Sequence, residues 1–303
     1  MTELATHTGE ALTEENARRA LTSACQRLGL PSTGAELIRI GSNAVFRVDG
    51  DTIARVAPSL GHQENARKQI DVARWLARVG YPAVRALDVE QPVEADGRVV
   101  TFWESIAPET RYAPIGDVAR LIRRLHALDA PPDVRLPDLQ PFGAPGDPLP
   151  DLPSISSEDV EFLHERIAWA RGRFSELPYA LPRGIVHGDA NVGNVLVDTG
   201  GRAVLIDLDG FSVGPREWDL VQTALFADRL GWHSRQEYEE FAEVYGHDLL
   251  TWSGYGDLAD MREVAMTTWL CRKAADSPAI AAEARKRVQA IRTGSSRLDW
   301  GAY

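Results

Sequence analysis

The chain has 303 residues, 44% of them hydrophobic and 25% charged, a composition typical of a globular protein with one large domain or two ordinary ones. Its formal net charge of −11 disfavours nucleic-acid binding, because attraction to phosphates needs a basic surface. No apolar run approaches the ~20 residues of a membrane helix, and the polar N-terminus is unlike a secretory signal, so we expect no membrane association. Two distant cysteines, Cys25 and Cys271, predict buried thiols in a reducing cytoplasm.

The first hundred residues alternate between helical and strand patterns. Apolar residues recur at helical spacing in two runs, the first capped by Thr13, while Asp-Gly pairs between β-rich runs are typical of hairpin turns. In chain order we expect helix, two strands, helix and two strands over 13–28, 36–48, 51–57, 63–79, 83–89 and 98–103. This order predicts a small antiparallel sheet with a helix across it.

The remainder of the chain predicts mainly helices. Helical spacing indicates a helix over 117–128, capped by Asp117, and another over 157–177, while 216–293 is largely helical. The proline-rich stretch 129–153 predicts a long irregular connection. We therefore expect an α+β fold with a β-rich domain over 1–104 and an α-rich domain over 105–303.

One stretch carries the polar groups of a catalytic centre. In VHGDANVGNVLVDTGGRAVLIDLDG, residues 186–210, two apolar runs flank Asp-Thr-Gly-Gly, so we expect a hairpin. Asp189 and Asn194 precede its first strand, and Asp207 follows its second. Oxygen ligands of this kind suit Mg²⁺. The pattern His-x-Asp-x-x-x-x-Asn followed by a metal-binding Asp is that of phosphoryl transfer, in which the first Asp accepts the proton of the attacking hydroxyl.

These motifs give the chain a resemblance to a known family. HGDANVGN, IDLDG and the later GPREWDL resemble the motifs of the aminoglycoside phosphotransferases, small-molecule kinases with a protein-kinase-like fold. The resemblance implies a two-lobed fold with a small antiparallel β N-lobe and a larger, mainly α C-lobe. It also implies ATP and Mg²⁺ as cofactors, Asp189 as the catalytic residue, Asn194 and Asp207 as metal ligands, and a structural role for Asp219 beneath the catalytic loop.

The template implies further residues that hold the nucleotide. Gly41-Ser42-Asn43 lies between two strand-like runs, so Ser42 and Asn43 fit a phosphate-binding loop. The strand cation of the template falls on Arg55, because only three of the 33 basic residues are lysines and none precedes Lys68. Its helical acidic partner falls on Gln69, with Glu64 nearby. The linker TFWESI corresponds to the hinge, where adenine is expected to bond the backbone at Glu104 and Ile106.

The acceptor is expected to be a small hydroxylated molecule. No Ala-Pro-Glu motif follows IDLDG, and Gly214-Pro215 leaves no room for a long peptide-docking loop. From Arg216 to Glu263 there are 11 acidic residues against four arginines, a net charge of −7, which suggests a cationic acceptor such as an aminoglycoside or aminosugar. The expected substrate-lining residues are Asp228, Asp257, Asp260, Glu263 and Trp269.

Other functions fit parts of the same pattern. A non-catalytic nucleotide-binding homologue is one alternative, because Arg55 replaces a lysine and Gln69 an acid. A kinase of a neutral sugar, a macrolide or another metabolite is a second. A metallophosphoesterase is disfavoured, because only His233 and His247 follow the motif and neither has the context of a metal ligand.

Overall fold

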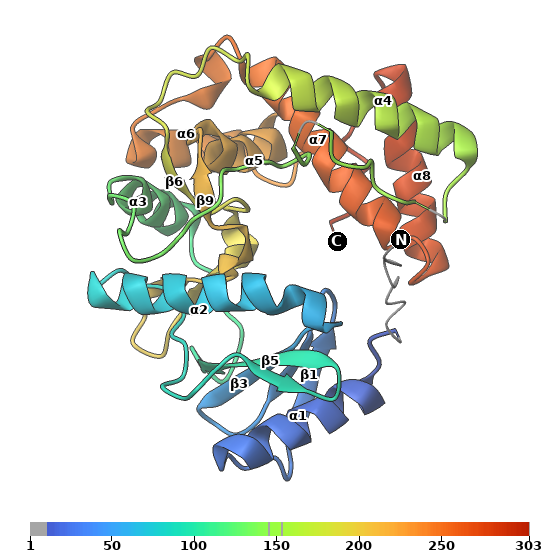
Figure 1. Cartoon of the computed structure of the whole chain (residues 1–303). Coiled ribbons are helices and arrows are strands. Elements are labelled where there is room, and N and C mark those ends of the chain that lie inside the picture. Colours follow the sequence, from blue (N-terminus) through green and yellow to red (C-terminus); the bar gives the residue numbers. More distant parts are fainter. Residues whose placement is uncertain (1–10, 145, 153, 303) are drawn as a thin grey trace. The chain divides into compact units, whose positions relative to one another are not determined.

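The computed structural model describes residues 11–144, 146–152 and 154–302 (Figure 1). The predicted α+β class is confirmed. The α-helices are α1 Glu14–Leu28, α2 Gln63–Arg78, α3 Ile115–His126, α4 Ser157–Phe174, α5 Glu217–Asp228, α6 Arg235–Tyr245, α7 Tyr255–Arg272 and α8 Pro278–Thr293. The strands are β1 Glu36–Ile40, β2 Ala44–Arg47, β3 Thr52–Val56, β4 Val93–Ala95, β5 Arg98–Glu104, β6 Gly184–Val186, β7 Val195–Val197, β8 Ala203–Leu205 and β9 Ser212–Gly214. Short 3₁₀ turns are η1 Leu60–His62, η2 Val192–Asn194, η3 Leu208–Gly210 and η4 Leu249–Thr251.

The chain forms two compact units. The first contains the residues up to Ala113 together with Ala130–Leu136 and Gly193–Phe211. The second contains Pro114–Asp129, Pro137–Val192 and the residues from Ser212 onward. The first unit therefore includes two segments that lie beyond residue 104 in sequence, and a domain boundary at that residue stays a prediction.

A five-stranded antiparallel sheet in the order β1-β2-β3-β5-β4 forms the centre of the first unit. β5 is buried on both faces because its side chains alternate between two helices. Val100 and Phe102 join the core beneath α1, whereas Val99 packs with Ala66 of α2 on the other face. Figure 1 shows α1 and α2 on opposite sides of this sheet. The sheet thus holds both the β3 residue Arg55 and the end of β5 in a fixed register.

Three local predictions about secondary structure are wrong. Residues 36–48, expected to form one strand, form the two paired strands β1 and β2 with a turn at 41–43. Residues 83–89 form no strand, because their amides pair with different segments: Val84 donates to the Leu205 carbonyl and Leu87 to that of Phe102. The outer strand is instead the short β4. Helix α3 begins at Ile115 after Pro114, so Asp117 lies in the first turn and does not cap it. Proline, with its fixed φ and missing N–H, suits the start of a helix.

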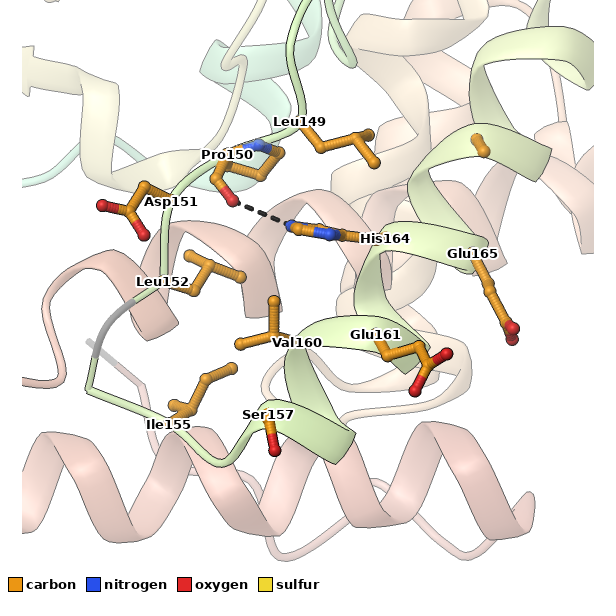
Figure 2. A pocket seen from close by; sticks show the side chains of 11 residues that line it. Leu149, Pro150, Asp151, Leu152, Ile155, Ser157, Val160, Glu161, His164 and Glu165 are labelled. Atoms are coloured by element: carbon orange, nitrogen blue, oxygen red, sulfur yellow. Dashed lines mark hydrogen bonds between the residues drawn. The ribbon is translucent and has the colours of Figure 1, made fainter.

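Helices α4, α7 and α8 pack together in the second unit around an apolar cluster that includes Leu163 and the buried thiol of Cys271. The irregular connection covers part of α4. Figure 2 shows Leu152 and Val160 side by side, with His164 Nε2 donating to the Pro150 carbonyl at 2.9 Å. Within the described residues, no helix combines the length and apolar character needed to cross a membrane.

The start of α1 carries a testable feature. Thr13 caps the helix as predicted: its hydroxyl accepts the Asn16 amide at 3.3 Å, and the Asn16 side chain accepts the Thr13 amide at 2.9 Å. Thr13→Ala removes the first acceptor and is expected to lower the free energy of unfolding, measured in urea, by about 1 kcal/mol. Thr13→Ser keeps the hydroxyl and serves as the control. Equal stability of the Ala variant and wild type would contradict the cap.

Candidate active site

The β7–β8 hairpin brings Asn194 and Asp207 to the same end. Val195 pairs with Leu205, and the amide of Ile206 donates to the Asn194 carbonyl at 2.9 Å. The next residue is Asp207, which therefore lies beside the start of the hairpin's first strand. The predicted hairpin is confirmed, with its turn at residues 198–202. The two oxygen-bearing side chains expected to bind metal occupy adjacent positions within the first unit.

Asp207 has an unusual backbone conformation and a cationic partner. Its φ of 62° and ψ of 65° lie in the left-handed region, which non-glycine residues adopt rarely and often at functional sites. Its Oδ1 accepts from Arg55 Nη1 at 3.3 Å, and the Arg55 guanidinium lies over the Trp103 ring. Arg55 is largely buried, with 16% of its side chain exposed. The partner of Arg55 is therefore the Asp207 carboxylate, while Gln69 bonds to Asn65 on its own helix.

Lys68 stabilises the turn that follows Asp207. Its ammonium donates to the carbonyls of Asp209 and Phe211, the latter at 3.2 Å. Burial lowers the pKa of Lys68, and the charge of Asp209 opposes that effect. Sequence patterns had placed Lys68 on a helix without a role. A lysine one helical turn from Glu64 gives no local signal that it will reach a loop some 140 residues away, and only the fold reveals it.

The residues expected to bind the nucleotide lie at two turns of the first unit. Ser42 and Asn43 form the β1–β2 turn, which is closed by the Gly41 amide donating to the Asn43 carbonyl at 3.0 Å. The Glu104 amide donates to the Arg85 carbonyl at 2.9 Å, so its carbonyl is the group left for a base. Within the described part of the chain, the Ile106 amide has no hydrogen-bond partner. An acceptor at Glu104 and a donor at Ile106 match the edge of a purine.

Asp219 holds the loop that carries Asp189 in the second unit. Its fully buried carboxylate accepts the amides of His187 at 2.6 Å and Gly188 at 2.8 Å, and it bonds His126 Nε2 at 3.0 Å. Burial alone raises the pKa of Asp219, but the hydrogen bond and charge of His126, with the His187 amide, hold it below its usual value. The structure agrees with the buttressing role expected for this residue.

Asp189 itself is paired with a cation from a distant helix. Arg262 of α7 donates to Asp189 Oδ1, and it also donates to Gln222 of α5. Asp189 keeps 45% of its side chain exposed, whereas Arg262 keeps 8%. His187, fully buried, accepts the Asp189 amide at Nδ1. No sequence motif marks Arg262, which is one of four arginines in the acidic segment 216–263.

The acidic residues expected to line an acceptor site are paired within the second unit. Each carboxylate has a partner: Asp228 with Tyr255, Asp257 with Arg173, Asp260 with Arg229, and Glu263 with Arg229 and Arg297. Glu263 is 1% exposed, so a ligand reaches it only if these contacts rearrange. Trp269 is exposed on α7, as a stacking surface requires. The hollow beside α4 in Figure 2 contains none of the predicted site residues.

The donor set at the hairpin fits Mg²⁺. Asn194 and Asp207 supply one amide and one carboxylate oxygen, and no cluster of three or more His, Cys, Asp or Glu side chains suited to a metal occurs among the described residues. Mg²⁺ is commonly held by one or two carboxylates together with substrate phosphates, so two protein ligands match its chemistry. Arg55, which bonds Asp207, would be a second positive charge beside a divalent ion held there.

The Asp219 network predicts an acid-dependent loss of stability. Asp219→Asn removes the charge that two amides and His126 share, and it is expected to lower the free energy of unfolding by about 3 kcal/mol at neutral pH. Because the folded-state pKa is depressed, this contribution is complete above the ordinary value of about 4 and disappears as pH falls through the lower folded value. Urea unfolding of wild type and variant between pH 7 and 3 measures it.

Glu239→Gln, at an exposed carboxylate of α6, is the matched control and should leave stability nearly unchanged at neutral pH. The wild type should lose its advantage over Asp219→Asn as the solution is acidified. A constant difference across the pH range would show that the Asp219 carboxylate does not act through its charge.

Known proteins share this architecture. Amicoumacin kinase hAmiN, solved with AMP-PNP and Ca²⁺, is 13% identical with a TM-score of 0.66, over 88% of this chain and 90% of that one. Choline kinase LicA from Streptococcus pneumoniae is 15% identical with a TM-score of 0.59, over 87% and 95%. Aminoglycoside phosphotransferase APH(3'')-Id from Streptomyces rimosus is 20% identical with a TM-score of 0.59, over 81% and 96%. No curated protein matches the chain.

The structural likenesses establish a protein-kinase-like fold, since their sequence identities are too low to carry more. The model of the phosphotransferase enzyme family, APH, matches residues 36–264, which include the hairpin, the His-Gly-Asp loop and most of α7. Because this match covers most of the chain, it shows family membership, which structural similarity at low identity does not. The chain therefore belongs to the phosphotransferase enzyme family.

Proposed function

We propose that this protein transfers the γ-phosphate of ATP to a hydroxyl group of a small molecule. The observation that carries the proposal is the His-Gly-Asp loop, whose amides are fixed by the buried Asp219 and whose Asp189 remains exposed to a substrate. The nucleotide complexes of related folds, with AMP-PNP in hAmiN and AMP in LicA, support a nucleotide donor.

Each residue has a distinct part in the proposed transfer. Asp189 accepts a hydrogen bond from the acceptor hydroxyl and takes its proton, as the oxygen forms a bond to the γ-phosphorus and the bond to the β-phosphate oxygen breaks, which releases ADP. Ser42 and Asn43 bind phosphate oxygens through the turn, and Arg55 binds them through its guanidinium. Asn194 and Asp207 would hold Mg²⁺, which would neutralise phosphate charge. Glu104 and Ile106 orient the base.

A small acceptor is favoured over a peptide. β9 ends at Gly214 and α5 begins at Glu217, so only two residues connect them. Peptide kinases place a long activation segment after the metal-binding Asp, and this connection leaves no length for one. Relatives of the same fold are named for small acceptors, namely amicoumacin, choline and spectinomycin.

A cationic acceptor and a neutral acceptor are each supported by a different observation. The overall charge of −11 favours a cationic acceptor, such as an aminoglycoside, through long-range attraction. The pairing of Asp257, Asp260 and Glu263 with arginines favours a neutral sugar or macrolide, because those carboxylates already have cationic partners. A cationic acceptor should lose kcat/KM as salt is raised, whereas a neutral acceptor should not.

Asp189→Ala tests the function directly. We expect kcat to fall by about 100- to 10,000-fold, because the loss removes the proton acceptor, while ATP affinity stays within about 3-fold of wild type. ADP release is measured with Mg²⁺-ATP and a panel of an aminoglycoside, choline, a neutral sugar and a macrolide. ATP affinity is measured separately by calorimetry.

Glu239→Gln is again the control, and its kcat should equal that of wild type. Wild-type turnover that persists in Asp189→Ala would contradict the assignment of Asp189. Nucleotide binding by wild type, with neither ATP hydrolysis nor transfer to any acceptor of the panel, is the result expected of the non-catalytic homologue.

A further inference from the structure

Arg262 is a buried cation of the second unit that contacts the loop carrying Asp189. Its side chain is 8% exposed, and its Nη2 donates both to Asp189 Oδ1 and to Gln222 Oε1. Its Nη1 lies 3.5 Å from the Gly188 carbonyl. Its Nε has no hydrogen-bond partner among the described residues. The polar contacts of this guanidinium are therefore made by Nη1 and Nη2.

Helix α5 frames this guanidinium. Trp218 and Gln222 are four residues apart and so share one face of the helix. The Arg262 guanidinium carbon lies 5.0 Å from the centroid of the Trp218 ring, and the Trp218 indole N–H donates to the Gly188 carbonyl at 2.9 Å. Figure 1 shows α5 and α7 in the second unit, and the two helices are in contact. A planar group held by a ring on one side and an amide at its edge has little rotational freedom.

Helix α7 directs its charges to two different sides. Asp260 and Glu263, three residues apart on one face, both bond Arg229 at the end of α5. Arg262 projects from another face and reaches Asp189. The acid-rich helix therefore presents a cation, not an anion, to the exposed carboxylate of the loop.

We propose that Arg262 is a positioning residue for the transfer, which holds Oδ1 of Asp189 so that the carboxylate presents one fixed orientation to the acceptor hydroxyl. The proposal rests on the function proposed above. A carboxylate that turns freely offers the hydroxyl many unproductive geometries, whereas one anchored at a single oxygen offers few. The 45% exposure of Asp189 leaves room for the hydroxyl beside this anchor.

The pair also bears on which acceptors bind. Arg262 balances the charge of Asp189, so an ammonium group of the substrate gains little attraction from this carboxylate. The acceptor is then recognised at Asp189 by its hydroxyl. The consequence is that replacing Arg262 by a neutral residue should improve binding of a cationic acceptor relative to a neutral one, even as turnover falls.

A kinetic experiment tests the positioning role. The variants are Arg262→Ala and Arg262→Lys, assayed with Mg²⁺-ATP and either the acceptor found active in the panel or water. Both reactions are read as ADP release. We expect kcat of the Ala variant to fall about 100-fold with KM for ATP within about 3-fold of wild type, since a displaced catalytic group costs rate more than binding. Arg262→Lys should recover part of the loss, and millimolar guanidinium should partly rescue Arg262→Ala.

Arg287 provides a matched control. It is also a buried arginine of this unit, 3% exposed, paired with Glu283 at 3.0 Å and stacked on Trp300. Among the described residues, its contacts do not include the loop that carries Asp189. Arg287→Ala should therefore lose stability without a specific loss of kcat and without rescue by guanidinium. If Arg262→Ala matched Arg287→Ala in kcat per folded protein, the positioning role would be overturned.

A second measurement does not depend on activity. Urea unfolding midpoints of Asp189→Ala, Arg262→Ala and the double variant report the coupling of the two side chains. Asp189→Ala should lower the midpoint because it leaves a buried guanidinium without its carboxylate, and the double variant should be no less stable than Arg262→Ala. Strictly additive shifts would overturn the pairing itself. Coupled shifts in a wild type without turnover would instead reject the proposed function and leave the pair intact.

Discussion

The His-Gly-Asp loop of the second unit, which carries the proposed catalytic residue, depends on hydrogen bonds from two backbone amides to one buried carboxylate. Asp219 accepts the amides of His187 and Gly188, and Gly188 itself adopts a φ of 89°, which favours glycine. A fully buried carboxylate is costly unless it is hydrogen-bonded, and here three donors satisfy it. The residue that carries the proposed chemistry, Asp189, follows directly, so its backbone position is set by an anion 30 residues further along the chain.

In each unit, an arginine pairs with a carboxylate that has a proposed catalytic or metal-binding role. In the first unit Arg55 pairs with Asp207, and in the second unit Arg262 pairs with Asp189. The planar guanidinium suits this use, because it donates in fixed directions and stacks on a ring, Trp103 in one case and Trp218 in the other. Each proposed catalytic or metal-binding carboxylate thus has a cationic partner that is more deeply buried than the carboxylate itself. In each pair, the buried guanidinium restricts the orientation of the more exposed carboxylate.

Pairing with arginines also changes how the acidic segment 216–263 is interpreted. A count of charges over 216–263 suggests an anionic surface, yet Asp257, Asp260 and Glu263 bond arginines from α4, the end of α5 and the C-terminal region. Two of these partners, Arg173 and Arg297, lie outside the segment that was counted. A local charge sum cannot include partners that the fold brings from elsewhere, which is why the segment suggested a cationic ligand more strongly than the paired side chains do.

Local patterns were sufficient for features that depend on neighbours in sequence. The capped helix at Thr13, the hairpin after Asn194 and the α+β class follow from spacing and turn residues. The strand expected over 83–89 was wrong because its amides serve two distant partners, and the contacts of Lys68 and Arg262 reach loops 73 to 143 residues away. Among 30 arginines, no spacing distinguishes the one that meets the catalytic loop. Motif residues can be predicted from sequence. The residues that contact and orient the motif, such as Lys68 and Arg262, can be identified only from the tertiary structure.

We propose that Asp189, Asn194 and Asp207 serve one phosphoryl transfer. A crystal structure of the protein with Mg²⁺ and AMP-PNP tests it most directly. We predict a metal ion at about 2.0–2.1 Å from side-chain oxygens of Asn194 and Asp207, with the γ-phosphate bound to that ion. A metal ion bound to other residues, or a γ-phosphate out of reach of any hydroxyl bonded to Asp189, would contradict the account.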